Sequence, residues 1–242
     1  MEQLLQDAKL LQAIVEGSTH IVFFGGAGVS VESGIPDFRS VDGLYNTKWK
    51  YPPETVLSRS FFDTHTEEFY DFYREKMIHP QAMPNPAHLA LAEWERKGKS
   101  VSVVTQNIDG LHQAAGSNVV YELHGSVHRN ACMSCGKAYG LSAVTEGARV
   151  PLCSCGGVIK PKVVLYEEAL DDDTVVGAVN AIASADTLII AGTSLRVYPA
   201  AGLIRYFGGK NLVCIDPNGQ DLRGAITLRH PVGKLLEKIH LS

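Results

Sequence analysis

The chain has 242 residues, 45% of them apolar and 20% charged, a composition typical of a globular protein. Its net charge of −4 gives no general electrostatic attraction to nucleic acid or to anionic membranes, and we expect neither as a partner. The first residues lack the basic and apolar segments of a signal peptide, and every apolar run is much shorter than the ~20 residues of a membrane helix. We therefore expect a cytoplasmic protein.

Helical and strand patterns alternate along the chain. Apolar residues at helical spacing predict a first helix over 4–16, and further helices are predicted over segments such as 87–97 and 172–184. Short β-branched runs predict buried strands at 19–24, 101–105, 119–122, 187–191, 211–216 and, more weakly, 226–228. Strands that alternate with helices favour a parallel, doubly wound sheet. The predicted fold class is therefore α/β and Rossmann-like.

Two stretches interrupt this alternation. Residues 41–84, rich in aromatic and charged side chains, predict a helical insert, and residues 128–158 contain a cluster of cysteines. We predict one catalytic domain over 1–242, in which segments 1–40, 85–127 and 159–242 form the Rossmann-like part.

Four of the five cysteines fall into two close pairs. Cys132 and Cys135 form a C-x-x-C turn, and Cys153 and Cys155 form a C-x-C turn. Four thiolates at ~2.3 Å complete the tetrahedral shell of Zn²⁺ and leave no position for water, which predicts one structural zinc per chain. A redox pair or a disulfide stays an alternative. Cys214, in an apolar run, is predicted to be a core residue.

A glycine-rich turn follows the first predicted strand. Gly26-Ala27-Gly28 stands where a Rossmann domain holds a pyrophosphate on backbone N–H groups, but the third glycine of G-x-G-x-x-G is Val31 here. This departure argues against an ordinary dehydrogenase, and a simple tight turn stays an alternative. The segment 30–39 after it suits either a flap over a ligand or an ordinary loop.

Five sequence blocks, in order along the chain, resemble the signatures of the sirtuins, the NAD-dependent protein lysine deacylases. They are GAGVSVESGIPDFR at 26–39, TQNIDGLH at 105–112, ELHG at 122–125, the two cysteine pairs, and GTSLRVYP at 192–199. The resemblance implies transfer of the acyl group from a lysine to ADP-ribose, with release of nicotinamide and 2'-O-acyl-ADP-ribose. It implies NAD as co-substrate and acyl-lysine side chains of other proteins as partners. We expect a monomer.

The resemblance also implies roles for individual residues. His124 matches the general base, and Asn107 is implied as a second catalytic residue. The implied cofactor contacts are Ala27, Gly28, Val31, Asp37, Phe38, Arg39, Gln106, Asn107, Ile108, Asp109, Thr193, Ser194, Asp216 and Val232. The implied substrate contacts, on two segments that pair with the peptide backbone, are Val163, Val164, Tyr166 and Leu195. His88 and His112 are expected to be structural.

Several positions depart from the family pattern. Glu167 replaces the glycine of a common Phe-Gly-Glu, and its charge predicts a preference for basic residues beside the acyl-lysine. Asp216 replaces an asparagine and predicts a modest affinity for NAD, because a carboxylate cannot donate a hydrogen bond. Desuccinylating sirtuins carry Tyr-x-x-Arg, whereas the matching residues are Tyr70 and Tyr73, which predicts a preference for uncharged acyl groups.

Two other functions use the same features. A mono-ADP-ribosyltransferase would share the NAD pocket but have a different acceptor, and a zinc-stabilised NAD-binding module would have no turnover. The block that contains His124 favours deacylation over the first, and the polar set at 106–109 argues against the second.

Overall fold

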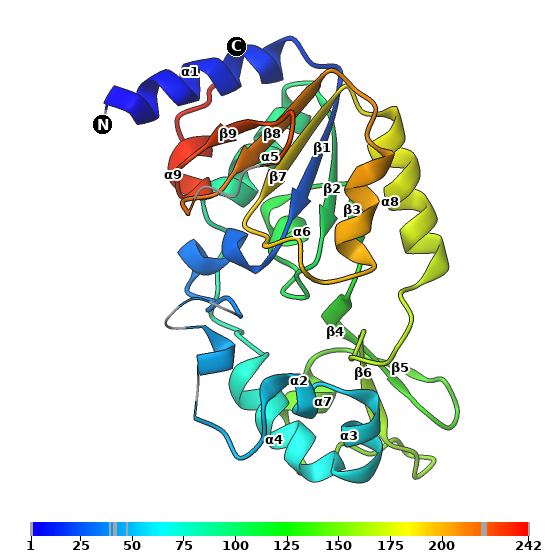
Figure 1. Ribbon diagram of the computed structural model, residues 1–242. Coiled ribbons are helices and arrows are strands. Elements are labelled where there is room, and N and C mark those ends of the chain that lie inside the picture. The colour runs from blue at the N-terminus through cyan, green and yellow to red at the C-terminus, as the bar shows by residue number, and fades with distance from the viewer. Residues whose placement is uncertain (1, 39, 41–42, 47, 219–221, 242) are drawn as a thin grey trace.

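The larger of two lobes is a six-stranded parallel sheet flanked by helices (Figure 1). The computed structural model describes residues 2–38, 40, 43–46, 48–218 and 222–241. The strand order is β3-β2-β1-β7-β8-β9. The strands are β1 (His20–Gly25), β2 (Ser100–Thr105), β3 (Val120–Glu122), β7 (Thr187–Ala191), β8 (Asn211–Ile215) and β9 (Ile226–Leu228). The α/β, Rossmann-like prediction is confirmed.

Alternating side chains along the strands feed two separate cores. In β1, Ile21 and Phe23 pack into one core while Val22 and Phe24 pack into the other. Because both faces are covered, the strands are continuous apolar runs, as parallel sheets require. The first core includes α1 (Glu2–Glu16), α5 (Pro86–Arg96) and α9 (Val232–Leu236). The second includes α8 (Asp172–Ser184) and η4 (Ala200–Tyr206).

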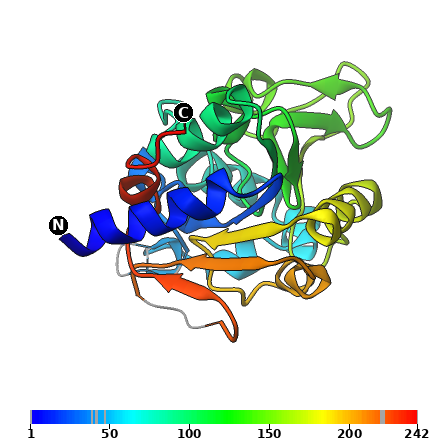
Figure 2. The ribbon, with the colours of Figure 1, turned by 90° about the horizontal axis from the view of Figure 1, so that it is seen from above.

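Figure 1 and Figure 2 show α1 beside α9 at one edge of the large lobe. The buried side chains Ala8, Leu11 and Val15 recur at helical spacing along α1 and account for this packing. The short helix α6 (Leu111–Ala115) follows β2 and was not predicted from the sequence.

The smaller lobe combines the helical insert with the cysteine module. Its helices are α2 (Pro53–Val56), α3 (Arg59–Thr64), α4 (Thr66–Lys76) and α7 (Ser142–Thr145). Its antiparallel sheet, in the order β5-β4-β6, consists of β4 (Gly125–Cys132), β5 (Ala138–Tyr139) and β6 (Ile159–Val163). Aromatic side chains of α3 and α4 share one buried core with residues of this sheet and of the cysteine turns. The two inserted segments therefore form one lobe.

Arg74 attaches α4 to α7 and to the segment that follows it. Its guanidinium donates to the backbone oxygens of Val144, Ala148 and Arg149 at 2.6, 2.9 and 2.7 Å. These bonds hold the guanidinium against the backbone of the cysteine module.

Candidate active site

A cleft of about 1240 Å³ opens between the two lobes, at the carboxyl ends of β1, β2 and β7. Open α/β sheets bind ligands at this edge. The predicted site residues that line the cleft are Ala27, Gly28, Val31, Asp37, Phe38, Gln106, Asn107, Ile108, Asp109, His124, Val163, Val164, Tyr166, Thr193, Ser194, Asp216 and Val232.

One residue predicted to contact substrate is not among the described residues that line the cleft. Leu195, expected to contact substrate, packs against the core that contains α8 and η4, and its backbone adopts a left-handed conformation (φ 52°). Its side chain therefore serves the core of the large lobe. Arg39 lies outside the residues that the structure describes.

The glycine-rich turn is in close contact with the end of β7. The N–H of Gly28 donates to the backbone oxygen of Gly192 at 2.8 Å, and a Cβ on Gly28 would lie 2.7 Å from the Gly192 Cα. The turn continues as two short 3₁₀ helices, η1 (Ala27–Val29) and η2 (Val31–Ser33). Val31 is 46% exposed. Since no long helix packs at Val31, the third glycine of a dehydrogenase is not needed there.

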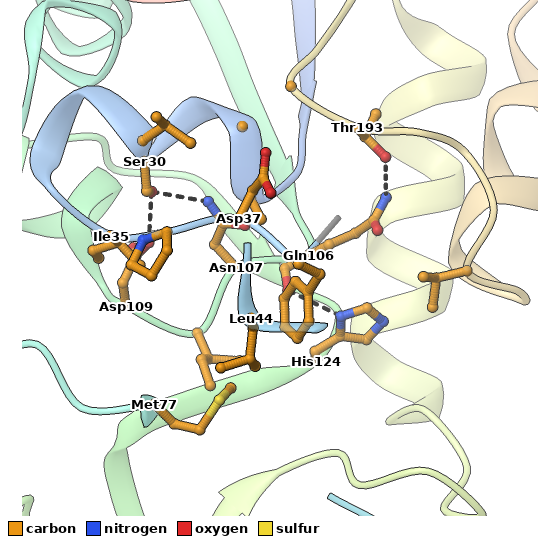
Figure 3. Close-up of a pocket in the computed structure, with 18 of the residues that line it drawn as sticks. Ser30, Ile35, Asp37, Leu44, Met77, Gln106, Asn107, Asp109, His124 and Thr193 are labelled. Carbon is orange, nitrogen blue, oxygen red and sulfur yellow. Dashed lines mark hydrogen bonds between the residues drawn. The ribbon is translucent and has the colours of Figure 1, made fainter. Parts of the chain in front are cut away.

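Ser30 links two polar residues of the β2–α6 loop (Figure 3). The Ser30 hydroxyl donates to the Asp109 Oδ2 at 2.6 Å and accepts from the Asn107 Nδ2 at 3.0 Å. The other Asp109 oxygen accepts from the Leu111 backbone N–H at 2.9 Å. Ser30 is 1% exposed, so these bonds form away from water and fix both side chains. Ser30 was not among the predicted site residues, although it lies in the block at 26–39.

His124 is held in one tautomer by the backbone (Figure 3). Its Nδ1 lies 2.9 Å from the Gln106 carbonyl oxygen, and because a carbonyl only accepts, Nδ1 carries the proton. Nε2 is then the nitrogen with the basic lone pair. Burial lowers the pKa of His124 below 6.5, and the Gln106 carbonyl opposes this effect. The imidazole is therefore neutral at physiological pH.

Gln106 also joins the ends of β2 and β7. Its Nε2 donates to the Thr193 hydroxyl at 3.2 Å, and that hydroxyl accepts from the Leu195 backbone N–H (Figure 3). Asp216, at the end of β8, accepts from the Asn218 backbone N–H at 2.7 Å. The carboxylate of Asp216 therefore stabilises its own turn.

A pair of buried histidines lies beneath this site. The rings of His88 and His112 are 4.6 Å apart, and both side chains are at most 1% exposed. His88 Nδ1 accepts from the Asn85 N–H and completes the cap of α5. Burial lowers the pKa of His88 to about 4 and the pKa of His112 well below 6.5, so both rings are neutral.

Two fully buried tyrosines occupy the α4 positions compared above with Tyr-x-x-Arg. The Tyr70 hydroxyl donates to the Ile159 backbone oxygen, and Tyr73 lines the cleft. Burial raises the pKa of both hydroxyls, so both are neutral. Arg74, the next residue, is committed to the carbonyl groups described above.

The four predicted zinc ligands lie together. The sulfur atoms of Cys132, Cys135, Cys153 and Cys155 are all within 4.8 Å of one another, with separations of 3.4 Å for Cys132–Cys155 and 3.6 Å for Cys135–Cys153. A tetrahedral Zn²⁺ with ~2.3 Å bonds separates its sulfur ligands by about 3.8 Å. The cluster therefore fits a structural zinc ion, and Cys214 is buried in the large lobe.

Comparisons with known proteins agree with this site. The family model that matches, over residues 26–199, is that of the Sir2 family. A protein of Clostridium acetobutylicum named NAD-dependent protein deacetylase is 56% identical over 98% of this chain and 99% of that protein. One of Clostridium perfringens with the same name is 54% identical over 95% of this chain and 96% of its own length.

Solved structures of Sir2 proteins have the same fold as this chain. A Sir2 with a p53 peptide and NAD⁺ superposes with a TM-score of 0.83 at 38% identity, with 96% of each chain covered. A Sir2 variant with a deacetylated p53 peptide and 3'-O-acetyl ADP ribose gives a TM-score of 0.85 at 38% identity, again with 96% of each chain covered. The chain belongs to the Sir2 family.

Proposed function

We propose that this protein is an NAD-dependent protein lysine deacetylase that releases nicotinamide and 2'-O-acetyl-ADP-ribose. The observation that carries the proposal is His124, a neutral imidazole with a fixed tautomer, in one cleft with the polar side chains of Gln106, Asn107 and Asp109. The names of the relatives support it, because proteins more than 50% identical over nearly the whole chain are NAD-dependent protein deacetylases.

The residues of the cleft suit the binding of NAD. Asp37, Ile108 and Asp109 would form the nicotinamide pocket, while Gln106 and Asn107 would position the ribose next to it. Ala27, Thr193 and Ser194 offer N–H and hydroxyl donors for phosphates and for the second ribose, and Gly28 lines the cleft beside them. Val31, Asp216 and Val232 line the same cleft and would complete the cofactor site. When bound, NAD supplies the ADP-ribose that accepts the acyl group.

His124 would act as the general base. A neutral imidazole with a lone pair on Nε2 can take the proton of a ribose hydroxyl, while the Gln106 carbonyl stabilises the imidazolium that forms. Phe38 would exclude water from the reacting sugar carbon. Asn107, fixed by Ser30, would keep the ribose in position for the transfer.

The acyl-lysine peptide would lie along residues 163–168. The N–H groups of Val164, Leu165 and Tyr166 already donate to the His124 backbone, the Glu168 carboxylate and the Leu57 backbone. This segment is thus fixed by the chain itself, and Val163, Val164 and Tyr166 would line the acyl-lysine channel. Main-chain recognition of the peptide would then use backbone groups of the two segments other than these three N–H groups, and it implies a broad tolerance for peptide sequence.

We propose further that uncharged acyl groups are preferred. Tyr73 is neutral and stands where desuccinylases carry the arginine that binds an acyl carboxylate, and Arg74 is bound to backbone carbonyls. The kcat/KM values of matched acetyl-lysine and succinyl-lysine peptides measure this preference. Faster turnover of the succinyl peptide would contradict it.

The deacetylase activity is tested with NAD and an acetyl-lysine peptide, by following nicotinamide and deacetylated peptide together. We expect equal amounts of both, lost in His124→Ala and retained in His20→Ala, an exposed histidine at the opposite end of β1. ADP-ribose attached to protein would favour a mono-ADP-ribosyltransferase. No nicotinamide release would favour an NAD-binding module without turnover.

Location and assembly are part of the same proposal: a monomer in the cytoplasm, with other proteins as substrates and neither nucleic acid nor membrane as partner. Within the described part of the chain, no helix has both the length and the apolar character needed to cross a membrane. Size-exclusion chromatography with light scattering tests the monomer, since a dimer would have twice the mass of 26.2 kDa.

A further inference from the structure

A hydrogen bond between two tyrosine hydroxyls connects the segment proposed to bind peptide with the loop that carries Phe38. The hydroxyls of Tyr45 and Tyr166 are 2.8 Å apart. Tyr45 lies on η3 (Leu44–Asn46), and Tyr166 follows β6. Both residues line the cleft, and Tyr166 is 39% exposed.

The Tyr45 end of this pair is joined to Asp37 and Phe38. The backbone N–H of Tyr45 donates to the Phe38 oxygen at 2.9 Å, and that of Leu44 donates to the Asp37 oxygen at 2.7 Å. The Tyr45 and Phe38 rings also pack edge to face, 5.6 Å apart. A displacement of Tyr45 therefore moves the two residues proposed to face the nicotinamide end of NAD.

The Tyr166 end is fixed. Its N–H donates to the Leu57 oxygen at 2.9 Å, and its own oxygen accepts from the Arg59 N–H at 3.0 Å. The backbone of Tyr166 is thus held on both sides, and the bond between the two hydroxyls attaches Tyr45 to this held residue.

The strength of this bond depends on water. In the free protein the bond is exposed, so water competes for both hydroxyls and it contributes little. A peptide along 163–168 would cover the hydroxyls and remove that competition, which strengthens the bond. Peptide binding would then favour the loop position that completes the NAD site, and by linkage NAD would favour peptide binding equally.

We propose that Tyr45 and Tyr166 are positioning residues that couple the peptide site to the NAD site through this bond. The inference rests on the proposed function. It concerns a hydroxyl that a phenylalanine at either position would not provide.

Binding of an unreactive carbocyclic NAD analogue, measured by calorimetry without and with a saturating acetyl-lysine peptide, tests the coupling. We expect the peptide to tighten analogue binding in the wild type. Tyr45→Phe and Tyr166→Phe should each reduce this tightening about threefold, the effect of one modest hydrogen bond. The double variant should reduce it no further, because either change removes the same bond.

Tyr206→Phe is the matched control, since its hydroxyl contacts Arg205 away from the cleft, and it should keep the wild-type coupling. Equal weakening of analogue binding with and without peptide, or a double variant with the summed effects of the single ones, would overturn the inference. So would a wild type in which the peptide binds but does not tighten the analogue. Failure of the wild type to bind or deacetylate the peptide would instead overturn the proposed function.

Discussion

Glu167 combines a strained backbone conformation with favourable side-chain hydrogen bonds, and substitutions can separate the energetic effects of the strain and of the hydrogen bonds. Its φ of 76° lies in the left-handed region, which costs a residue with a Cβ about 1 kcal/mol or more. Its carboxylate accepts from the Ser60 backbone N–H at 2.8 Å and from the Ser60 hydroxyl at 2.9 Å. Ser60 is in the first turn of α3, where a carboxylate also interacts favourably with the helix dipole.

The two effects predict different results for alanine and glycine. Glu167→Ala loses both hydrogen bonds but keeps the left-handed strain, and since the bonds are exposed we expect a loss of about 1–2 kcal/mol in the free energy of unfolding. Glu167→Gly loses the same bonds but removes the strain, so it should be more stable than the alanine variant by about 1 kcal/mol.

Urea denaturation followed by circular dichroism measures both variants. The matched control is the pair Lys9→Ala and Lys9→Gly at an exposed position of α1. In an ordinary helix the alanine variant is more stable than the glycine variant by about 1 kcal/mol, which is the opposite order to that expected at Glu167. Ser60→Ala removes only the hydroxyl contact and should cost less than Glu167→Ala. If Glu167→Gly is no more stable than Glu167→Ala, the backbone at 167 is not strained and the reasoning fails.

Three further predictions concern titration and metal. Because burial lowers the pKa of His124, the acidic limb of the kcat/KM profile should have its midpoint below pH 6.5; a midpoint above 6.5 would contradict the assigned environment. His88 and His112 are neutral in the folded state but bind protons near pH 6.5 when unfolded, so stability should be full above 6.5 and fall towards pH 4. His112→Phe should reduce the slope of the free energy of unfolding against pH in this range by about 1.4 kcal/mol per pH unit. Denaturation series at several pH values measure this slope, and an unchanged slope would contradict the assigned protonation of His112. Metal analysis should find one zinc per chain, and Cys153→Ser should lose it and lower the Tm by ~10 °C or more; full stability without zinc would show that the cluster is not structural.

Local patterns were sufficient to predict the strands of the large lobe and the helices α1, α5 and α8. The runs at 187–191 and 226–228 coincide with β7 and β9, and the helix predicted over 172–184 coincides with α8. A β-branched run is buried in a parallel sheet whichever strands lie beside it, so its pattern is visible without tertiary information. The cysteine cluster was visible for a similar reason, since short turns bring each pair of thiolates together.

Local sequence patterns did not predict contacts between residues far apart in the chain. Ser30 contacts Asn107 and Asp109 only because β1 and β2 are neighbours in the sheet, and no local pattern marks it. Tyr45 and Tyr166, 121 positions apart, meet only after both lobes have formed. Leu195 is predicted to contact substrate from its place in a block, and no local pattern indicates that its partly buried side chain packs against the core that contains α8 and η4.

The pairing of β4 with β6 explains how a zinc ion in the cysteine cluster can affect a reaction in the distant cleft. His124 immediately precedes β4, whose last residue is the zinc ligand Cys132. β4 pairs with β6, which leads into the proposed peptide segment, and the Val164 N–H donates to the His124 oxygen at 2.9 Å. The peptide segment thus follows one of two paired strands whose far ends the cysteine cluster joins, whereas Gln106 of the large lobe holds the His124 ring. Loss of zinc should therefore misalign the peptide against an intact base and NAD site, and kcat should fall more than NAD affinity.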